Sequence, residues 1–275
     1  MVSKLMPYVP THCIYVELFG GGASLLLGKQ PSDVEVYNDL NSGLVNFFRV
    51  LRDAKQFKQF QRLAYLTPYA REEFDLCKKT WRETPDLVEQ AHRWFIVARM
   101  SFGGNFSSWG YGVTGSCRGM AAQVSKWFGS IEKLPEVSAR LLRAQIENKD
   151  ALKLIDCYDS PETFFYLDPP YVLSTRKGGG YEHELTDESH KRLVKVLQGI
   201  KGKALLSGYA NPIYAELERS GWQRRDWDAT CSLSGHTRVN GRMGEGAAKQ
   251  KQKRVESIWF NYEVEEGNKE LALEP

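Results

Sequence analysis

The alternation of strands and helices in this chain begins at residues 14–22, where the sequence reads IYVELFGGG. The first six of these residues are mostly apolar and predict a short strand, and the three glycines after them predict a tight turn. Residues 23–29 predict a helix, and residues 34–37, VEVY, predict a second strand. Apolar residues then recur at helical spacing over residues 44–51. This order predicts an α/β domain with a parallel sheet and right-handed crossovers.

The α/β pattern is interrupted between residues 55 and 143. Residues 55–99 predict helices, residues 101–112 are rich in Gly, Ser and aromatic side chains and suit a hairpin or mobile loop, and residues 130–143 predict a further helix. We therefore predict an α/β domain in two parts, residues 1–54 and 144–275, around a mainly helical insertion at residues 55–143. The second part is expected to contain strands at 144–147, 163–167, 204–207, 221–228 and 257–262, a short helix ending at 157 and a helix at 186–198.

The bulk composition, 42% hydrophobic and 26% charged over 275 residues, is that of a globular protein with a full core. The net charge of +3 is too small to prove a polyanionic partner. Its distribution is more informative, because residues 101–130 contain no Asp or Glu, and residues 236–254 contain six Lys or Arg against the single Glu245. Five cysteines without metal-like spacing predict free thiols, and no apolar stretch approaches the roughly 18 residues of a membrane span. We expect a cytoplasmic protein with no metal and no membrane partner.

A second informative stretch is TFFYLDPPY, residues 163–171. Its first five residues predict a buried strand, and Asp168, Pro169, Pro170 and Tyr171 follow directly. The prolines lack a backbone N–H and end the strand, while their fixed φ angles shape the turn and their carbonyl oxygens can accept hydrogen bonds. These features predict a catalytic loop. For these four residues alone, a rigid structural turn is the alternative.

Three predicted strand ends carry residues suited to ligand binding. The glycines at 20–22 follow the first strand, Asp39 follows the second and Asp168 follows the strand at 163–167. Ligands bind beyond the carboxyl ends of parallel strands at a switch point, so we expect these residues around one crevice. An acidic residue after the second strand suits a ribose. The spacing of a P-loop is absent and Leu25 stands at the third glycine position of the dinucleotide fingerprint, which favours an adenosine-type cofactor without phosphates.

Four segments, in this order, resemble the DNA adenine-N6 methyltransferases that use S-adenosylmethionine: ELFGGG at 17–22, NDLN at 38–41, NKD at 148–150 and DPPY at 168–171. The resemblance extends over residues 2–262, and the order of parts is that of the DNA adenine methylase group, which includes phage and restriction-associated members. It implies a Rossmann-like methyltransferase fold with a mostly parallel sheet and helices on both faces. It also implies site-specific methylation of the N6 amino group of adenine in duplex DNA.

The resemblance further implies which part of the chain does what. Residues 1–54 would form the cofactor side of the catalytic domain, residues 55–143 the target-recognition insertion and residues 144–275 the rest of the catalytic domain. The glycine turn would hold the methionine part of S-adenosylmethionine, Asp39 the ribose and Asp150 the adenine. The implied cofactor-binding residues are Glu17, Phe19, Gly20, Gly21, Gly22, Asp39, Asp150 and Asp168, and the implied catalytic residues are Asp168, Pro169, Pro170 and Tyr171.

The chemistry explains why such a loop is needed. The adenine amino nitrogen is a poor nucleophile because its lone pair is delocalised into the ring. Asp168 and the carbonyl of Pro169 can each accept one N6 hydrogen bond, which favours a tetrahedral nitrogen whose lone pair points at the methyl group. Tyr171 would stack on the base, and the base must flip out of the duplex to reach this pocket.

The acid-free part of the insertion supplies candidate DNA contacts, since Arg pairs naturally with guanine and Asn with adenine. Trp109 and Tyr111 are alternatively packing residues, and Asp39 or Asp150 are alternatively helix caps. The candidates, with two basic residues that follow the catalytic loop, are Phe102, Asn105, Trp109, Tyr111, Arg118, Lys126, Arg176 and Lys177.

The chain departs from the family at its start. Members usually carry a Lys- and Gly-containing segment before the first strand, whereas Met1 lies shortly before Ile14, and Leu18 stands where Pro is common. We expect either altered cofactor binding or a start internal to a longer natural chain. The alternatives to a DNA methyltransferase are a DNA-binding module without catalysis and an enzyme acting on RNA or a protein amide, against which Asp168 argues. We expect a monomer, and a cognate restriction endonuclease is among the partners that the resemblance implies.

Overall fold

The computed structural model describes residues 2–104, 106–112, 115–175, 184–230 and 253–264. The chain forms two compact units. The first comprises residues 1–41, 143–229 and 254–275, and the second comprises residues 42–142 and 230–253. The second unit thus begins at Ser42, before residue 55, because the helix that starts there packs on other helices of that unit. The assignment of cofactor binding and target recognition to separate parts of the chain stays a prediction.

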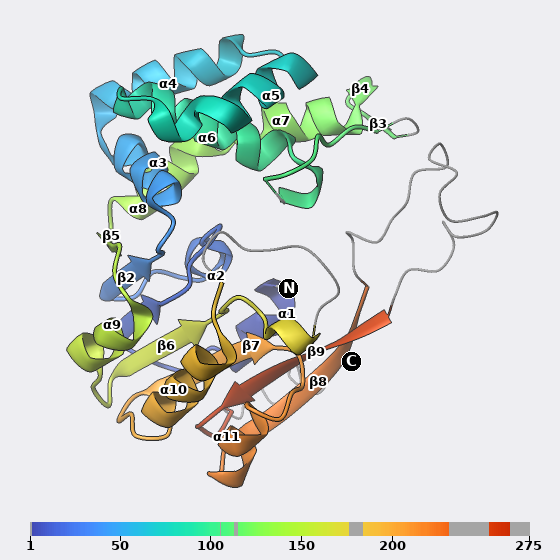
Figure 1. Ribbon diagram of the computed structural model, residues 1–275. Coiled ribbons are helices and arrows are strands. Elements are labelled where there is room, and N and C mark those ends of the chain that lie inside the picture. Colours follow the sequence, from blue (N-terminus) through green and yellow to red (C-terminus); the bar gives the residue numbers. More distant parts are fainter. Residues whose placement is uncertain (1, 105, 113–114, 176–183, 231–252, 265–275) are drawn as a thin grey trace, which may run out of the picture. The chain divides into compact units, whose positions relative to one another are not determined.

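A seven-stranded sheet organises the first unit, in the order β5-β2-β1-β6-β7-β9-β8 (Figure 1). β1 pairs in parallel with β2 and β6, β2 with β5, and β6 with β7, whereas β9 runs antiparallel to β7. The strands are β1 (Ile14–Glu17), β2 (Val34–Asn38), β5 (Ala144–Glu147), β6 (Thr163–Leu167), β7 (Lys203–Gly208), β8 (Gln223–Thr230) and β9 (Lys253–Phe260).

The strand order contains a switch point between β1 and β6. From β1 the chain adds β2 and then β5 on one side, and from β6 it adds β7 on the other. Loops that leave neighbouring strands at such a point diverge in opposite directions and leave a place for a ligand beyond the carboxyl ends of the strands. The fold therefore directs attention to the loops after β1, β2 and β6.

Helices cover both faces of the sheet, which explains why β6 is buried along its whole length. One face, with Val16, Phe165 and Leu206, packs against the three helices α9, α10 and α11, which Figure 1 shows side by side. On the other face lie alternate residues such as Tyr15 and Phe164, near the N-terminal segment. The helices of this unit are α1 (Val2–Leu5), α2 (Ser24–Gly28), α9 (Ala151–Tyr158), α10 (Asp187–Leu197) and α11 (Ala215–Arg219), with short 3-10 turns at Met6–Tyr8 and Leu173–Thr175.

The second unit is built from helices around an aromatic core. Phe47 stacks on Phe95 with a ring-centroid distance of 5.3 Å, and Phe60 and Trp94 also contact Phe47. A two-stranded hairpin, β3 (Ser116–Cys117) and β4 (Met120–Ala121), precedes α7. The helices are α3 (Ser42–Arg52), α4 (Ala54–Leu66), α5 (Arg71–Thr80), α6 (Leu87–Met100), α7 (Ala122–Glu132) and α8 (Leu134–Leu141), with 3-10 turns at Trp81–Glu83 and Phe102–Gly104.

Every strand that the sequence predicted is present; those at residues 144–147 and 163–167 have the predicted ends, and the others have shifted ends. The helix α7, which ends at Glu132, was not predicted, and the helix predicted at residues 130–143 is present as the shorter α8, which begins at Leu134 with Pro135 in its first turn. Proline is favoured there because the first helical N–H groups need no partner within the helix. In the described part of the chain, none of the helices has both the length and the apolar character that crossing a membrane requires.

Candidate active site

The candidate site is set by the register of three neighbouring strands. Glu17 in β1 pairs in register with Tyr37 in β2 on one side and Tyr166 in β6 on the other. The residue two positions beyond each member of this row is Phe19, Asp39 or Asp168, respectively. Adjacent strands lie about 4.8 Å apart, so the loops that carry these residues leave the sheet at one edge. The structure therefore brings together the three strand ends that the sequence analysis proposed as a site.

The glycine turn after β1 lies close to β2. The amide of Gly20 donates to the carbonyl of Asn38 at 2.8 Å, and the hydroxyl of Tyr37 donates to the carbonyl of Gly21 at 2.8 Å. A Cβ atom on Gly20 would lie 2.0 Å from the ring of Tyr37, so no larger residue fits. Gly21 has a φ of +49°, a conformation that L-residues rarely adopt, and a Cβ there would meet nothing within 4 Å. The glycine turn is thus fixed by hydrogen bonds to Asn38 and Tyr37 of β2, and the side of Gly21 on which a Cβ would lie is open.

Asp39 anchors the same turn through its carboxylate. Its Oδ2 atom accepts from the amide of Gly21 at 2.8 Å, and its Oδ1 atom accepts from the amide of Asn41 at 2.7 Å. The side chain is half-buried. In this structure Asp39 orders the backbone on which a ligand would rest, and direct contact with a ribose stays a proposal.

Two asparagines that the sequence analysis did not select as site residues join the strand ends. Asn38 is buried, and its amide group donates to the carbonyls of Leu18 and Lys149 and accepts from the amide of Lys149. Asn148 donates to the carbonyl of Asp39 at 2.6 Å. These bonds link the ends of β1, β2 and β5. The available signal in the sequence was an asparagine, Asn38, in the NDLN segment at the end of a predicted strand, because a buried polar side chain must find hydrogen-bond partners.

Glu17 is buried within this framework. Its Oε2 atom accepts from the hydroxyl of Tyr15 at 2.7 Å and from the amide of Leu26 in α2 at 2.9 Å. Burial raises the pKa of Glu17 to about 7, the two hydrogen bonds oppose this rise, and the charge of Asp168 adds to it. The carboxyl group therefore joins β1 to the helix after the glycine turn, and its role toward a cofactor stays a proposal.

Asp150 caps the helix that follows β5. Its Oδ1 atom accepts from the amides of Leu152 at 3.0 Å and Lys153 at 3.3 Å, at the first turn of α9. The helix-cap alternative is thus observed, and because the side chain is exposed, capping leaves room for a ligand contact as well.

Asp168 receives hydrogen bonds from outside its own loop. The hydroxyl of Ser207 in β7 donates to its Oδ1 atom at 2.9 Å. Surrounding protein atoms raise the pKa of Asp168, while hydrogen bonds from Ser207 and Tyr171 lower it. The net effect is a pKa above the ordinary value of an aspartate.

Tyr171 of the DPPY loop packs on a residue that directly follows β7. Tyr171 is half-buried, and its ring meets that of Tyr209 edge to face at a centroid distance of 4.5 Å. Pro169 is buried and Pro170 is half-buried. Sequence reasoning missed Ser207 and Tyr209. Their signal was their position, because both lie at or just beyond the carboxyl end of the predicted strand at residues 204–207.

The predicted DNA contacts in the second unit fall into different environments. Trp109 is half-buried, forms a β-bridge with Ser101 and contacts the ring of Tyr69 at 4.7 Å. Phe102 is half-buried in a 3-10 turn, whereas Tyr111 is exposed, with the guanidinium of Arg71 5.6 Å from its ring centre. Trp109 is therefore packed within this unit and Tyr111 presents a surface ring, while contact of either residue with DNA stays a prediction.

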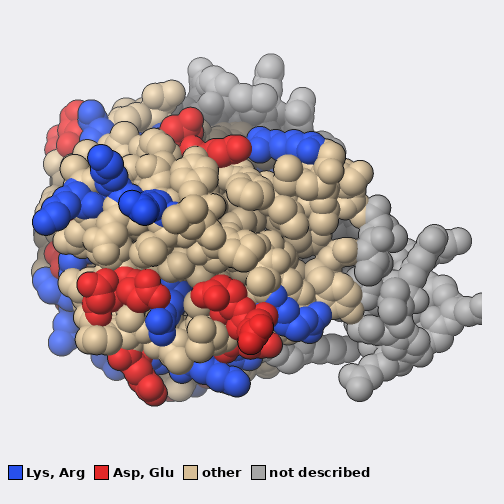
Figure 2. Space-filling model, turned by 90° about the horizontal axis from the view of Figure 1, so that it is seen from above, with Lys and Arg blue, Asp and Glu red and all other residues tan. Residues whose placement is uncertain are grey.

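The two basic candidates among the described residues, Arg118 and Lys126, are exposed. Arg118 lies in the turn between β3 and β4 and forms an ion pair with Glu132 of α7 at 2.9 Å. Lys126 is exposed on the same helix. Figure 2 shows both acidic and basic side chains on the face that it presents, so charge of one sign does not dominate there. Asn105, Arg176 and Lys177 lie outside the described residues, as does most of the basic stretch at residues 236–254.

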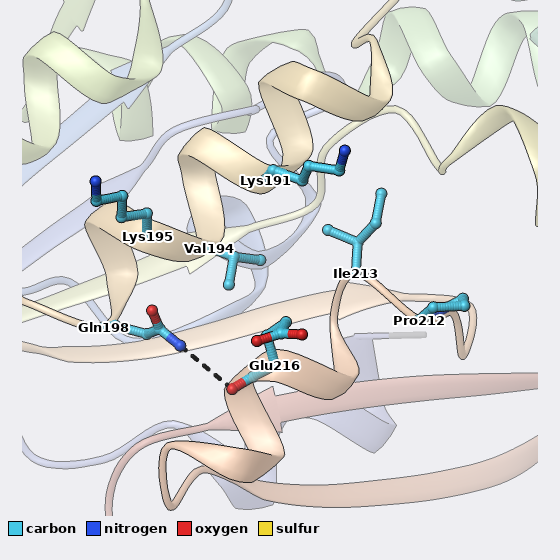
Figure 3. Close-up of a pocket in the computed structure, with 7 residues that line it drawn as sticks. All are labelled: Lys191, Val194, Lys195, Gln198, Pro212, Ile213 and Glu216. Atoms are coloured by element: carbon cyan, nitrogen blue, oxygen red, sulfur yellow. Dashed lines mark hydrogen bonds between the residues drawn. The ribbon is translucent and has the colours of Figure 1, made fainter.

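A surface pocket of about 520 Å³ lies elsewhere on the first unit, between α10 and α11 (Figure 3). None of the predicted site residues lines it. Among the described residues, no cluster of three or more His, Cys, Asp or Glu side chains could hold a metal ion. The lining residues are Lys191, Val194, Lys195, Gln198, Pro212, Ile213 and Glu216.

A mostly parallel seven-stranded sheet, flanked by helices and carrying a glycine turn and carboxylates beside its switch point, defines a Rossmann-like α/β protein. The family model of the D12 class N6 adenine-specific DNA methyltransferases matches residues 1–227, and the chain belongs to this family. The protein is therefore an enzyme that methylates the N6 position of adenine in DNA. This confirms the predicted fold class, family and enzymatic activity.

Proposed function

We propose that this methyltransferase takes its methyl group from S-adenosylmethionine bound at the glycine turn, and transfers it to an adenine that has flipped out of duplex DNA. The register of β2, β1 and β6 carries the proposal, because it sends the loops of Asp39, Phe19 and Asp168 out at one edge of the sheet. A cofactor and a target base bound at this edge of the sheet would lie within one site, which would make the methyl transfer effectively intramolecular.

The chemistry of the strand-end loops fits such a cofactor. The segments 17–22, 38–41 and 168–175 contain no Lys or Arg, and the acidic residues among them are Glu17, Asp39 and Asp168. A phosphate would lack a basic partner in these segments, whereas a sulfonium and an α-amino group carry positive charge. Gly21 and Gly22 are exposed, so that their backbone is accessible. The bound group would supply an electrophilic methyl; the protein's residues orient it.

On the target side, the DPPY loop would receive the amino group of adenine. Asp168 and the Pro169 carbonyl would accept its two N–H groups, and the ring of Tyr171 would stack on the base. Ring packing of Tyr171 on Tyr209 supports this assignment, because an aromatic side chain already ordered loses little freedom when a base stacks on it. The amino nitrogen would then direct its lone pair at the methyl group.

We also propose that the insertion predicted at residues 55–143 contributes target recognition. Tyr111, Arg118 and Lys126 are its exposed candidates. Action as a monomer and partnership with a cognate restriction endonuclease remain predictions.

The direct test uses the purified full chain with S-adenosylmethionine labelled in its methyl group and a library of duplexes. We expect label in N6-methyladenine at one sequence context, and loss of label from the Asp168→Ala variant, which removes the acceptor, at unchanged DNA affinity. Methylation without sequence preference, or an Asp168→Ala variant with full turnover, would contradict the proposal. Calorimetry with S-adenosylmethionine alone tests the cofactor side separately.

A further inference from the structure

A buried hydroxyl lies directly beside the carboxylate of the DPPY loop. Ser207 is 3% exposed and belongs to β7, which pairs with β6 in parallel. Leu167 pairs in register with Leu206, so Asp168 and Ser207 are the next residues along the two strands. Their proximity thus follows from the sheet itself and not from the conformation of a loop.

The hydrogen-bond pattern around Ser207 has one consistent direction. Its hydroxyl oxygen lies 2.9 Å from Asp168 Oδ1, 3.2 Å from the carbonyl of Leu167 and 3.4 Å from the hydroxyl oxygen of Tyr166. A serine has a single hydroxyl proton, and a carboxylate is the strongest acceptor of the three. Burial raises the pKa of Tyr166, so its hydroxyl stays protonated and can donate to Ser207. Tyr166 therefore donates to Ser207, and Ser207 donates to Asp168.

Asp168 also accepts a hydrogen bond from the hydroxyl of Tyr171, which differs from Ser207 in its place in the fold. Tyr171 lies in the same loop as the carboxylate, and its ring is the one proposed to stack on the target base. A partner within the loop moves with the loop. Ser207 lies in a strand that is paired on both sides, with β6 and with β9, so its position is set by the sheet.

We propose that Ser207 is a positioning residue of the methyl transfer, which holds Oδ1 of Asp168 so that the carboxylate faces the amino group of the target adenine. This rests on the proposed role of Asp168. Ser207 touches neither base nor cofactor in this proposal, and acts only through the carboxylate. Its effect is on orientation and on the ionisation of Asp168, because a donated hydrogen bond favours the charged form.

The test compares the full-length wild type with Ser207→Ala, which removes the donor without adding volume. Loss of a hydrogen bond to a charged group in the transition state should lower kcat by about 10- to 100-fold. We expect the KM for DNA to change less than about twofold, since this bond contributes little to ground-state binding. The acidic limb of the kcat profile should move to higher pH, because an Asp168 without this donor is protonated more easily.

A second readout does not depend on turnover. The infrared carboxylate band of Asp168, assigned by difference against Asp168→Asn, reports its titration directly. In Ser207→Ala the midpoint of this titration should rise. Ser207→Cys keeps a weaker donor of similar size and should fall between the other two, and it carries the test if the Ala variant does not fold.

Thr163→Val is the matched control. Thr163 is a buried hydroxyl at the opposite end of β6, where it donates to the carbonyl of Tyr158. Its loss should lower stability but leave the pH profile and the infrared midpoint unchanged.

The outcomes distinguish failure of the role proposed for Asp168 from failure of the role proposed for Ser207. If Asp168→Ala turns over as fast as the wild type, the proposed role of Asp168 is wrong. If Asp168→Ala is inactive while Ser207→Ala and Ser207→Cys match the wild type in kcat, pH profile and infrared midpoint, the positioning role of Ser207 alone is overturned. A fall in kcat shared equally by Thr163→Val would also overturn it.

Discussion

The carboxylate of Asp39 accepts a hydrogen bond from the amide of Gly21 at 2.8 Å, across the gap between the ends of β2 and β1. The bond holds a glycine whose φ is +49°, and the same carboxylate accepts from Asn41. An acidic residue that sequence patterns assign to a ribose is therefore also the residue that shapes the glycine turn. These two roles can be separated by substitution.

Asp39→Asn keeps one acceptor oxygen, which can serve the Gly21 amide, but loses the charge and the second acceptor that binds the Asn41 amide, whereas Asp39→Ala loses the charge and both hydrogen bonds. We expect the affinity for S-adenosylmethionine, measured by calorimetry, to fall moderately in the Asn variant and more in the Ala variant. Both variants should lose stability in chemical denaturation, and the Ala variant should lose about 1 kcal/mol more because it gives up a further hydrogen bond. Equal affinity of both variants and the wild type would show that Asp39 serves the fold alone.

Gly20→Ala should destabilise the protein and weaken cofactor binding. The new Cβ would lie 2.0 Å from the ring of Tyr37, and relieving this overlap costs about 1–3 kcal/mol in a packed region. Gly129→Ala is the control, because Gly129 lies in α7 and a Cβ there meets nothing within 4 Å. That variant should be neutral or slightly more stable. Unfolding midpoints in urea distinguish the two, and a Gly20→Ala protein as stable as the wild type would refute the predicted overlap.

Glu17 predicts a pH dependence of stability. Its pKa is about 7 in the folded protein against an ordinary value of 4.5, so the folded state holds a proton that the unfolded state has released between these pH values. The stabilisation is complete below about pH 4.5 and is lost as pH rises through 7. Glu17→Gln removes this loss, so its unfolding free energy relative to wild type should rise across that window, by on the order of 3 kcal/mol at most. A difference that stays constant with pH would contradict the raised pKa.

Glu132→Gln tests whether Arg118 contacts DNA. The ion pair between the two exposed side chains contributes little to stability, so thermal unfolding should be unchanged. Release of the guanidinium should increase DNA affinity severalfold, and Arg118→Ala should reduce it about tenfold. Titrations at several salt concentrations check both, because a phosphate contact steepens the salt dependence while a base contact alters sequence preference. If neither variant changes DNA binding, Arg118 lies outside the interface.

Local patterns predicted much of this architecture. The strand at residues 163–167 and the glycine turn were readable because a buried strand favours consecutive apolar residues and a turn favours glycine or proline. The boundary between α7 and α8 was not predicted. Both helices have apolar periodicity, and only Pro135 in the first turn of α8 marks the break.

The amino-acid sequence by itself determined that the domain is of the α/β class and that Asp39, the glycines and Asp168 follow strands. It also determined that the order of motifs is that of an adenine-N6 methyltransferase. Only the tertiary structure decided that Ser207 donates to Asp168, that Asn38 joins three strand ends and that Trp109 is packed against Tyr69. The physical reason is range. Apolar periodicity and turn chemistry act between neighbouring residues, whereas these contacts depend on strand order and register, which arise from pairing between segments far apart in the chain.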